Sequence, residues 1–147
     1  AQNTFISSSY WTERTGFAAA IETINQFEGS NVINHLVEVG GYFRNKMKYI
    51  FESLDVKIDG MLTVPVLVFG GDDGLSMKTY FTQEMLKRGF LASSLIYTCL
   101  SHSEKIIDNY AVAVADVIDQ IQEKYEDVKI SELLDGPVCH SGFNRLT

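Results

Sequence analysis

The 147-residue sequence predicts an α/β protein of the α+β type, a small, mainly antiparallel sheet covered by helices. Two observations indicate this class. Apolar residues repeat at helical spacing in four segments, and short β-rich runs bounded by glycine turns lie between them. The resulting order is helix, helix, strands, helix, strands, helix, which is typical of one sheet covered by helices.

Two helices are predicted at the start of the chain. The first begins within residues 12–16 and ends at Gly29, a residue type that often follows a helix. The second follows Ser30 or Asn31, both good N-caps, and ends at Asp55. Their apolar stripes are Phe17, Ala20, Ile21, Ile24 and Phe27 in the first and Leu36, Val39, Phe43, Met47, Ile50 and Leu54 in the second.

Strands are predicted next, over residues 56–61 and 64–69. Pro65 cannot donate a hydrogen bond to a ladder, so it belongs at the start or the edge of its strand. Residues 70–74 form a glycine-rich turn. Further strands are expected at residues 90–92 and 95–100, with Cys99 buried in the latter.

Two more helices complete the predicted fold. One contains Tyr80 and Phe81 and is stopped by residues 88–89. The other begins at a capping box, in which the Ser101 hydroxyl and the Glu104 side chain satisfy free backbone amides. Its buried stripe is Ile107, Tyr110, Val114, Val117 and Ile121. The tail, residues 130–147, holds a weak helical turn and an extended stretch.

Charge and composition exclude several classes of protein. A net charge of -7 and a pI near 4.8 argue against a nucleic-acid partner, which needs clustered basic residues. The longest apolar runs, such as residues 64–69, are far shorter than the ~20 residues that span a membrane. The two cysteines do not form a disulfide framework, so a cytoplasmic protein with free thiols is expected. Residues 1–9 look cut from something larger.

The segment Ser7–Arg14 is the best candidate for contact with a ligand. It brings three serines and Thr12 to the start of the first helix, where unpaired amides and the helix dipole suit a phosphate or a carboxylate. The alternative is that Thr12 serves only as an N-cap. The residues alone leave both interpretations open.

Other motifs give no sign of chemistry. The pairs Cys99 with His102 and Cys139 with His140 lack the spacing of a zinc site, so no metal is expected. The turn at 70–74 lacks a phosphate-binding lysine and carries two aspartates. No nucleophile, base and acid stand at a recognisable local spacing. From the residues alone, no catalytic residue is predicted.

Three stretches together resemble the class III aminotransferases, fold-type I enzymes that use pyridoxal 5'-phosphate (PLP). Residues 5–20, FISSSYWTERTGFAAA, carry the first likeness. Residues 85–94, followed by residues 100–104, resemble the family's C-terminal domain, where a helix, a glycine and a strand precede a Ser/Ala-His-Thr/Ser-Glu helix start. The closing stretch, residues 136–143, completes a resemblance that covers essentially the whole chain. Glutamate-1-semialdehyde aminomutase and similar enzymes are the nearest in pattern.

The resemblance implies that the chain is the C-terminal portion of an enzyme about three times longer. Residues 1–30 would end the large domain, and residues 31–147 would form the small domain. The lysine that binds PLP covalently and the aspartate at its ring nitrogen would lie upstream, so the chain alone would be inactive. The substrates implied are an amino acid and a keto acid or amino aldehyde, and the implied assembly is a homodimer.

The resemblance also assigns candidate site residues. Thr12 matches a threonine that reaches across the dimer interface to the PLP phosphate, and Ser8 and Ser9 are adjacent candidates. Phe17 replaces the family's usual proline. Ser94 falls roughly where the aminomutases have a substrate-side glutamate, which favours a transaminase over an aminomutase. The alternative hypothesis is a non-catalytic dimerisation or small-ligand-binding module.

Overall fold

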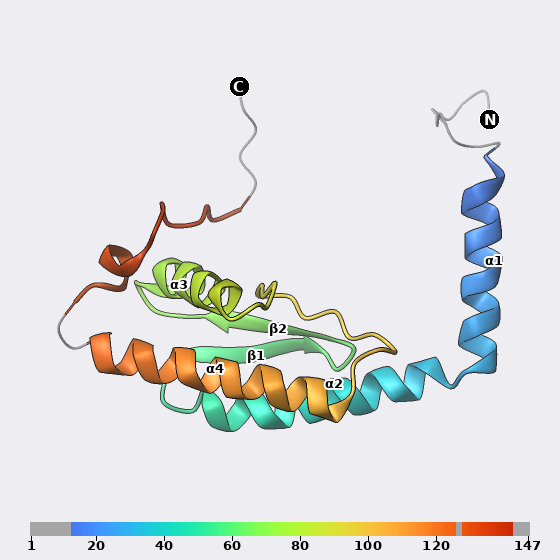
Figure 1. Cartoon of the computed structure of the whole chain (residues 1–147), viewed down its shortest axis with the longest axis horizontal. Helices are drawn as coiled ribbons and strands as arrows, with labels where there is room; N and C mark the ends of the chain where they lie inside the picture. Colours follow the sequence, from blue (N-terminus) through green and yellow to red (C-terminus); the bar gives the residue numbers. More distant parts are fainter. Residues whose placement is uncertain (1–12, 126–127, 143–147) are drawn as a thin grey trace. The chain divides into compact units, whose positions relative to one another are not determined.

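The computed structural model describes residues 13–125 and 128–142 (Figure 1). The chain divides into two compact units, Ala1–Asn34 and His35–Thr147. Within the described ranges, no helix combines the length and the apolar character needed to cross a membrane. The elements are α1 (Arg14–Gly29), α2 (Val32–Ile50), β1 (Val56–Met61), β2 (Val64–Phe69), α3 (Gly74–Lys87), α4 (Glu104–Tyr125) and the 3-10 turn η1 (Ile130–Leu133).

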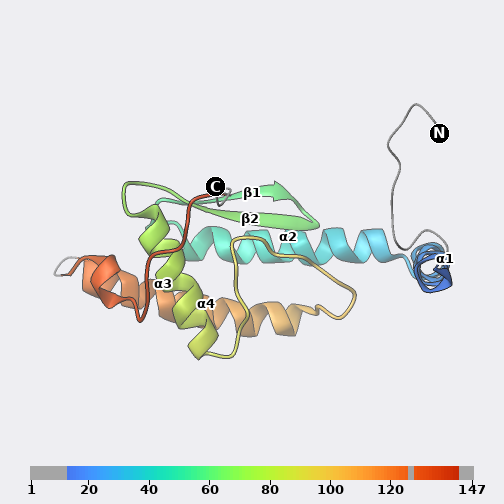
Figure 2. The same ribbon diagram turned by 90° about the horizontal axis from the view of Figure 1, so that it is seen from above.

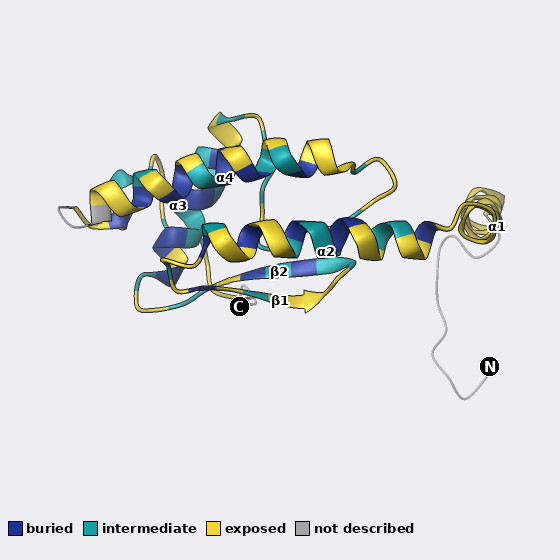
Figure 3. Cartoon of the chain, turned by 90° about the horizontal axis from the view of Figure 1, so that it is seen from below, coloured by how far each residue is buried: buried dark blue, intermediate teal, exposed yellow. Residues whose placement is uncertain are grey.

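Helix α1 has the predicted extent, and none of its side chains is buried (Figure 3). The Ser30 N–H donates to the Gln26 carbonyl at 3.1 Å and closes the last turn after Gly29. At the other end, Glu13 holds the N-cap position, so the interpretation of Thr12 as the N-cap is wrong. The backbone of Glu13 is extended and its side chain makes no capping hydrogen bond.

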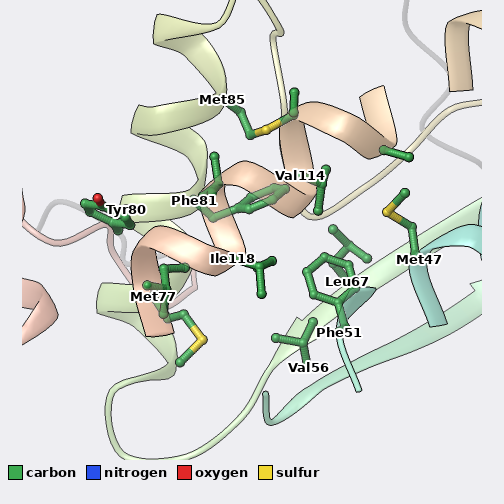
Figure 4. Packing of buried hydrophobic residues seen from close by; sticks show 14 of the residues in the cluster. Met47, Phe51, Val56, Leu67, Met77, Tyr80, Phe81, Met85, Val114 and Ile118 are labelled. Carbon is green, nitrogen blue, oxygen red and sulfur yellow. The ribbon is translucent and has the colours of Figure 1, made fainter. Parts of the chain in front are cut away.

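The second unit packs the rest of α2 with α3, α4 and the sheet around one core (Figure 4). Phe81 of α3 is fully buried, with ring centroids 6.3 Å from Phe51 and 5.5 Å from Phe69. The predicted stripe of α4 is confirmed at Ile107, Val114, Val117 and Ile121, which are all buried, while Tyr110 is partly buried.

Helices α2 and α4 lie side by side and run in the same direction (Figures 1 and 3). Asp108 of α4 accepts a hydrogen bond from the Tyr42 hydroxyl and forms an ion pair with Lys46, both at 2.8 Å. Further along, Gln122 donates to the Ser53 hydroxyl. The prediction that the second helix continues to Asp55 is wrong, because residues 51–55 form a turn after Ile50.

The sheet has two antiparallel strands, paired from Val56 with Phe69 to Met61 with Val64 (Figure 2). Both strands were predicted. The predicted strands at 90–92 and 95–100 are absent from the described structure, where a single isolated bridge joins Leu95 to Val66. Residues 94–98 run along β2 through three backbone hydrogen bonds. These join Leu67 N–H to Ser94 O at 2.8 Å, Ile96 N–H to Pro65 O at 3.0 Å and Thr98 N–H to Thr63 O at 3.3 Å.

Pro65 explains why this segment does not become a third strand. Its carbonyl accepts from Ile96, so an N–H at position 65 would point toward the same segment in an antiparallel ladder. Proline has no such donor, and the next bridge along the segment cannot close. The position agrees with the prediction, because the missing donor lies on the edge of β2 that faces away from β1.

The ends of α3 and α4 differ in how well the sequence predicted them. Helix α3 stops at Lys87, and Gly89 follows with a φ of 86°, as expected for a glycine after a helix. The predicted capping box is wrong. Helix α4 starts at Glu104 itself, and the hydroxyl that accepts an amide, from Ile106 at 3.4 Å, belongs to Ser103.

Candidate functional site

The predicted cofactor-binding residues Ser8, Ser9 and Thr12 lie outside the described residues. The adjoining start of α1 is described. Glu13 makes no side-chain capping bond, and the first turn contains no acidic residue. The first amides of α1 are therefore not capped by the preceding side chain, and no carboxylate in the first turn offsets the positive end of the helix dipole.

Ser94, the predicted substrate-side residue, lies in the segment that follows β2. Its carbonyl accepts the Leu67 N–H, which fixes the backbone of Ser94 against the edge of the sheet. Its side chain is partly buried and lines a cavity. Of the four predicted site residues, the described structure places Ser94 alone.

The cavity beside Ser94 has a volume of about 540 Å³ and is here called the polar cavity. Three parts of the second unit form its walls: one face of α3, the segment after it, and the tail. The lining residues are Lys78, Thr79, Thr82, Gln83, Ser93, Ser94, Gly136, Pro137 and Cys139. The sequence reasoning missed the α3 residues, although their spacing of four places them on one helix face.

Two side chains of α3 attach the tail to the wall of the polar cavity. The Gln83 side-chain oxygen accepts the Asp135 N–H at 2.7 Å. One turn earlier, the Thr79 hydroxyl accepts the Cys139 N–H at 3.0 Å. The cavity is therefore held together by hydrogen bonds between residues far apart in the sequence.

A cluster of charges lies beside the polar cavity. Glu84 pairs with Lys87 at 2.8 Å and with Arg88 at 3.3 Å, and Lys87 also pairs with Asp135 at 2.9 Å. Burial alone would raise the pKa of Glu84, but hydrogen bonds from Lys87, Gln83 and Arg88 lower it overall. The Glu84 carboxylate is therefore ionised at neutral pH and is paired with two cations.

An apolar groove of about 460 Å³ lies on the other side of residues 90–97, against α2 and α4. Phe90 contacts Tyr110 edge-on, with ring centroids 5.4 Å apart. The Tyr110 hydroxyl is buried and has no hydrogen-bond partner among the described residues. Burial raises the pKa of Tyr110, so its phenol stays neutral. The groove is suited to apolar contact rather than to acid-base chemistry.

The glycine-rich residues 70–74 form the predicted turn, beside an acidic hollow of about 370 Å³. Asp55, Asp72 and Asp73 line this hollow. A side chain at Gly70 would meet the Asp55 carboxylate, which would have to move aside. Within the described ranges, no three His, Cys, Asp or Glu side chains are arranged to hold a metal ion.

The two cysteines are free thiols in the structure. The prediction that Cys99 is buried in a strand is wrong, because the residue is exposed and lies in a turn. Its N–H donates to the Nδ1 of His102 at 3.1 Å. His102 therefore stabilises the turn before α4, which accounts for this Cys-His pair structurally.

Comparisons with known proteins give one informative match. No protein-family model and no curated protein matches the sequence. Among solved structures, the chain is similar to the PLP internal aldimine form of the FumI protein of Sphingopyxis sp. MTA144, with a TM-score of 0.76 and 18% sequence identity. The match covers 90% of this chain and 33% of that one. The chain therefore has the fold of about one third of a structure that carries PLP.

Proposed function

We propose that the chain is the C-terminal portion of a PLP-dependent aminotransferase of the class III kind. One observation carries the proposal: 90% of the chain fits a third of the PLP-bound FumI structure. The likeness of residues 5–20 to the class III family supports it independently of the coordinates. In this proposal residues 1–30 end the large domain and residues 31–147 form the small one.

The exposed apolar stripe of α1 supports the proposal that the chain is part of a larger protein. Its apolar stripe is 60% exposed at Phe17, 62% at Ile21, 58% at Ile24 and 44% at Phe27. An apolar helix face of this kind is normally covered, because burying apolar surface contributes about 25 cal/mol per Å². The remaining part of the enzyme would supply the cover.

The proposed activity is the transfer of an amino group between an amino acid and a keto acid or amino aldehyde. When bound, PLP supplies the electron sink that makes a substrate carbon acidic. In a homodimer, the hydroxyls of Thr12, Ser8 and Ser9 would donate hydrogen bonds to its phosphate in the neighbouring subunit. The start of α1 would add a positive dipole there. Ser94 would line the substrate side, and the covalent lysine would come from the upstream part of the enzyme.

Substituting Thr12 in the complete enzyme tests the phosphate contact. A charge-assisted hydrogen bond contributes roughly 1.5–3 kcal/mol, so Thr12→Ala should weaken PLP binding by about ten- to a hundredfold. Thr15→Ala, three residues on in the exposed first turn of α1, is the matched control and should change little. Equal PLP affinity of the Thr12 variant and the wild type, in a titration followed by absorbance, would contradict the assignment.

An experiment on the chain by itself tests whether the lysine that binds PLP covalently lies outside it. Mixed with PLP and reduced with borohydride, it should show no stoichiometric lysine adduct by mass spectrometry, because the reactive lysine is assigned to the upstream part. A single modified lysine at full occupancy would place that function in this chain and overturn the assignment. The coding sequence before Ala1 should contain the missing lysine.

A further inference from the structure

We propose that the apolar groove between residues 90–97, α2 and α4 binds a small neutral molecule with an apolar body. The one polar group of this molecule, a carbonyl or a hydroxyl, would accept a hydrogen bond from Tyr110. The proposal goes beyond the proposed function, which assigns the groove neither to PLP, nor to its substrate, nor to the rest of the enzyme. It depends on three features of the groove: the unpartnered hydroxyl of Tyr110, the direction of that side chain, and the absence of charge from the lining.

The Tyr110 hydroxyl is a buried donor without a partner. It is closed off from solvent and forms no hydrogen bond with any residue that the structure describes. A buried phenol normally has a partner, because taking the group out of water without one is unfavourable. The Nε of Arg44 is the other buried side-chain atom without a partner in the described ranges, but the same guanidinium donates to three carbonyls of β1 through its other nitrogens. A ligand that carries an acceptor would supply the partner that Tyr110 lacks.

The phenol ring of Tyr110 lies in the wall of the groove. Its centroid is 5.9 Å from that of the Phe43 ring and 5.4 Å from that of the Phe90 ring, and all three residues line the groove. An aromatic side chain on a helix points back toward the helix N-terminus, over the residues three and four positions earlier. For Tyr110 these are Ile107 and Ile106, which also line the groove. The hydroxyl is therefore directed along the groove.

The lining of the groove is uncharged. It contains no carboxylate, no lysine and no arginine. The Nδ1 of His102 accepts the Cys99 N–H at 3.1 Å, so this imidazole is the neutral tautomer with its proton on Nε2. The Ser93 hydroxyl exchanges hydrogen bonds with the backbone of Leu95. A charged ligand would lose its hydration here without gaining a counter-ion, so the groove favours a neutral one.

The size and the exposed apolar surface of the groove are those of a small-molecule site. Its volume of about 460 Å³ lies within the range of ligand pockets. Leu91, Leu95 and Tyr97 line it and are 94%, 44% and 68% exposed, so an apolar ligand would remove apolar surface from water. Because the Tyr110 hydroxyl is covered, a ligand reaches it by displacing part of the wall. Residues 90–97 form that wall without a helix or a strand, and local opening of such a segment costs less than unfolding of the core.

The test is a titration of the full chain with 4-phenylbutan-2-one, a neutral ketone with an aromatic body, followed by amide chemical shifts. Saturable binding is expected, with shifts concentrated at residues 90–97 and 106–110. The matched probe is 3-phenylpropionate, which has the same body and a carboxylate in place of the methyl ketone. It should bind at least about tenfold more weakly, because the lining offers it no cation. Absence of saturable ketone binding, or equal affinity for the two probes, would overturn the proposal.

A pair of variants decides whether the Tyr110 hydroxyl is responsible. Tyr110→Phe keeps the ring and should weaken ketone binding about three- to tenfold, because it removes the donor assigned to the ligand. Without ligand, this variant should resist thermal unfolding at least as well as the wild type, since the deleted hydroxyl has no partner. Tyr49→Phe makes the same change at a position on α2 that is 75% exposed and should leave affinity within about twofold. Unchanged affinity of the Tyr110 variant, equal losses in both variants, or a lower thermal stability of the Tyr110 variant would contradict the assignment.

Two further measurements separate a small-molecule site from a protein contact. Sedimentation of the chain should show the same oligomeric state with and without the ketone, whereas a dimer that the ketone dissociates would assign the groove to a second copy. Ketone binding should also persist in the complete enzyme. Its loss there would show that the rest of the enzyme covers the groove. Either result would overturn this proposal and leave the proposed function standing.

Discussion

Helices α1 and α4 are both amphipathic, but the apolar stripe of α4 is buried and that of α1 is exposed. Helix α4 buries its apolar stripe completely at Val114, Val117 and Ile121, which are 0% exposed. Helix α1 leaves its own stripe between 44% and 62% exposed. The difference shows that apolar spacing predicts which side of a helix will be covered, but not what covers it. For α4 the cover lies within its own unit, whereas the described residues of the first unit do not cover α1, and we assign that cover to the rest of the enzyme.

The largest expected effect lies in the packed unit. Phe81→Ala removes a fully buried ring that contacts Phe51 and Phe69. It should lower the free energy of unfolding by roughly 3–5 kcal/mol, because a cavity is left in the core. Chemical denaturation measures this. A loss below about 1 kcal/mol would show that the second unit is not packed as described.

Neighbouring glycines of α2 provide an internal control for close packing. A side chain at Gly40 would overlap the backbone carbonyl of Leu62, whereas one at Gly41 would meet nothing within 4 Å. Gly40→Ala should therefore destabilise the fold by roughly 3 kcal/mol. Gly41→Ala should stabilise it by about 0.5–1 kcal/mol, since alanine favours a helix. If both variants unfolded at the same denaturant concentration, the contact between α2 and the hairpin would be wrong.

The ionic cluster on α3 predicts a smaller, pH-dependent effect. The pKa of Glu84 is lowered in the folded protein, so its contribution is fully present above its ordinary value of 4.5 and is lost as the pH falls through the lowered one. Glu84→Gln should cost about 1 kcal/mol at pH 7. The gap from the wild type should shrink below pH 4.5. A gap that stays constant down to acid pH would show that the charge of Glu84 is not responsible.

The smallest change in stability is expected for a substitution on α1. It tests the comparison between α1 and α4 most directly. In this chain, Ile21→Ala should change stability by less than about 0.5 kcal/mol, because Ile21 is 62% exposed. In the complete enzyme the same substitution should cost about 2 kcal/mol or more. Equal, small effects in both proteins would indicate that the large domain does not cover this face of α1.

Much of the fold followed from local patterns. The ends of α1 and α3 depend on glycines and on residues next to them, and β1 and β2 on alternation, so the sequence predicted each of them. The capping serine of α4 was misplaced by two residues, because Ser101 and Ser103 are equally good candidates locally. The missing third strand depends on which backbone groups face each other across the sheet, and that information is not local.

The candidate site was predicted less completely. Family resemblance selected Ser94, but the polar cavity around it is closed by bonds from Thr79 and Gln83 to residues 135–139. Contacts across more than 50 residues leave no periodic signal in the sequence.

Pro65 has a further consequence for local stability. Three backbone hydrogen bonds and one from the Thr98 hydroxyl to the Thr63 carbonyl, at 2.8 Å, hold residues 94–98 along β2. Breaking so few bonds locally costs less than global unfolding. When this stretch opens, the bared edge of β2 is a template on which another chain could add a strand. Pro65, the second residue of β2, offers no N–H on that edge and interrupts such pairing. The residue that keeps the sheet at two strands would thus also limit edge-to-edge pairing with another chain if this edge of β2 became exposed.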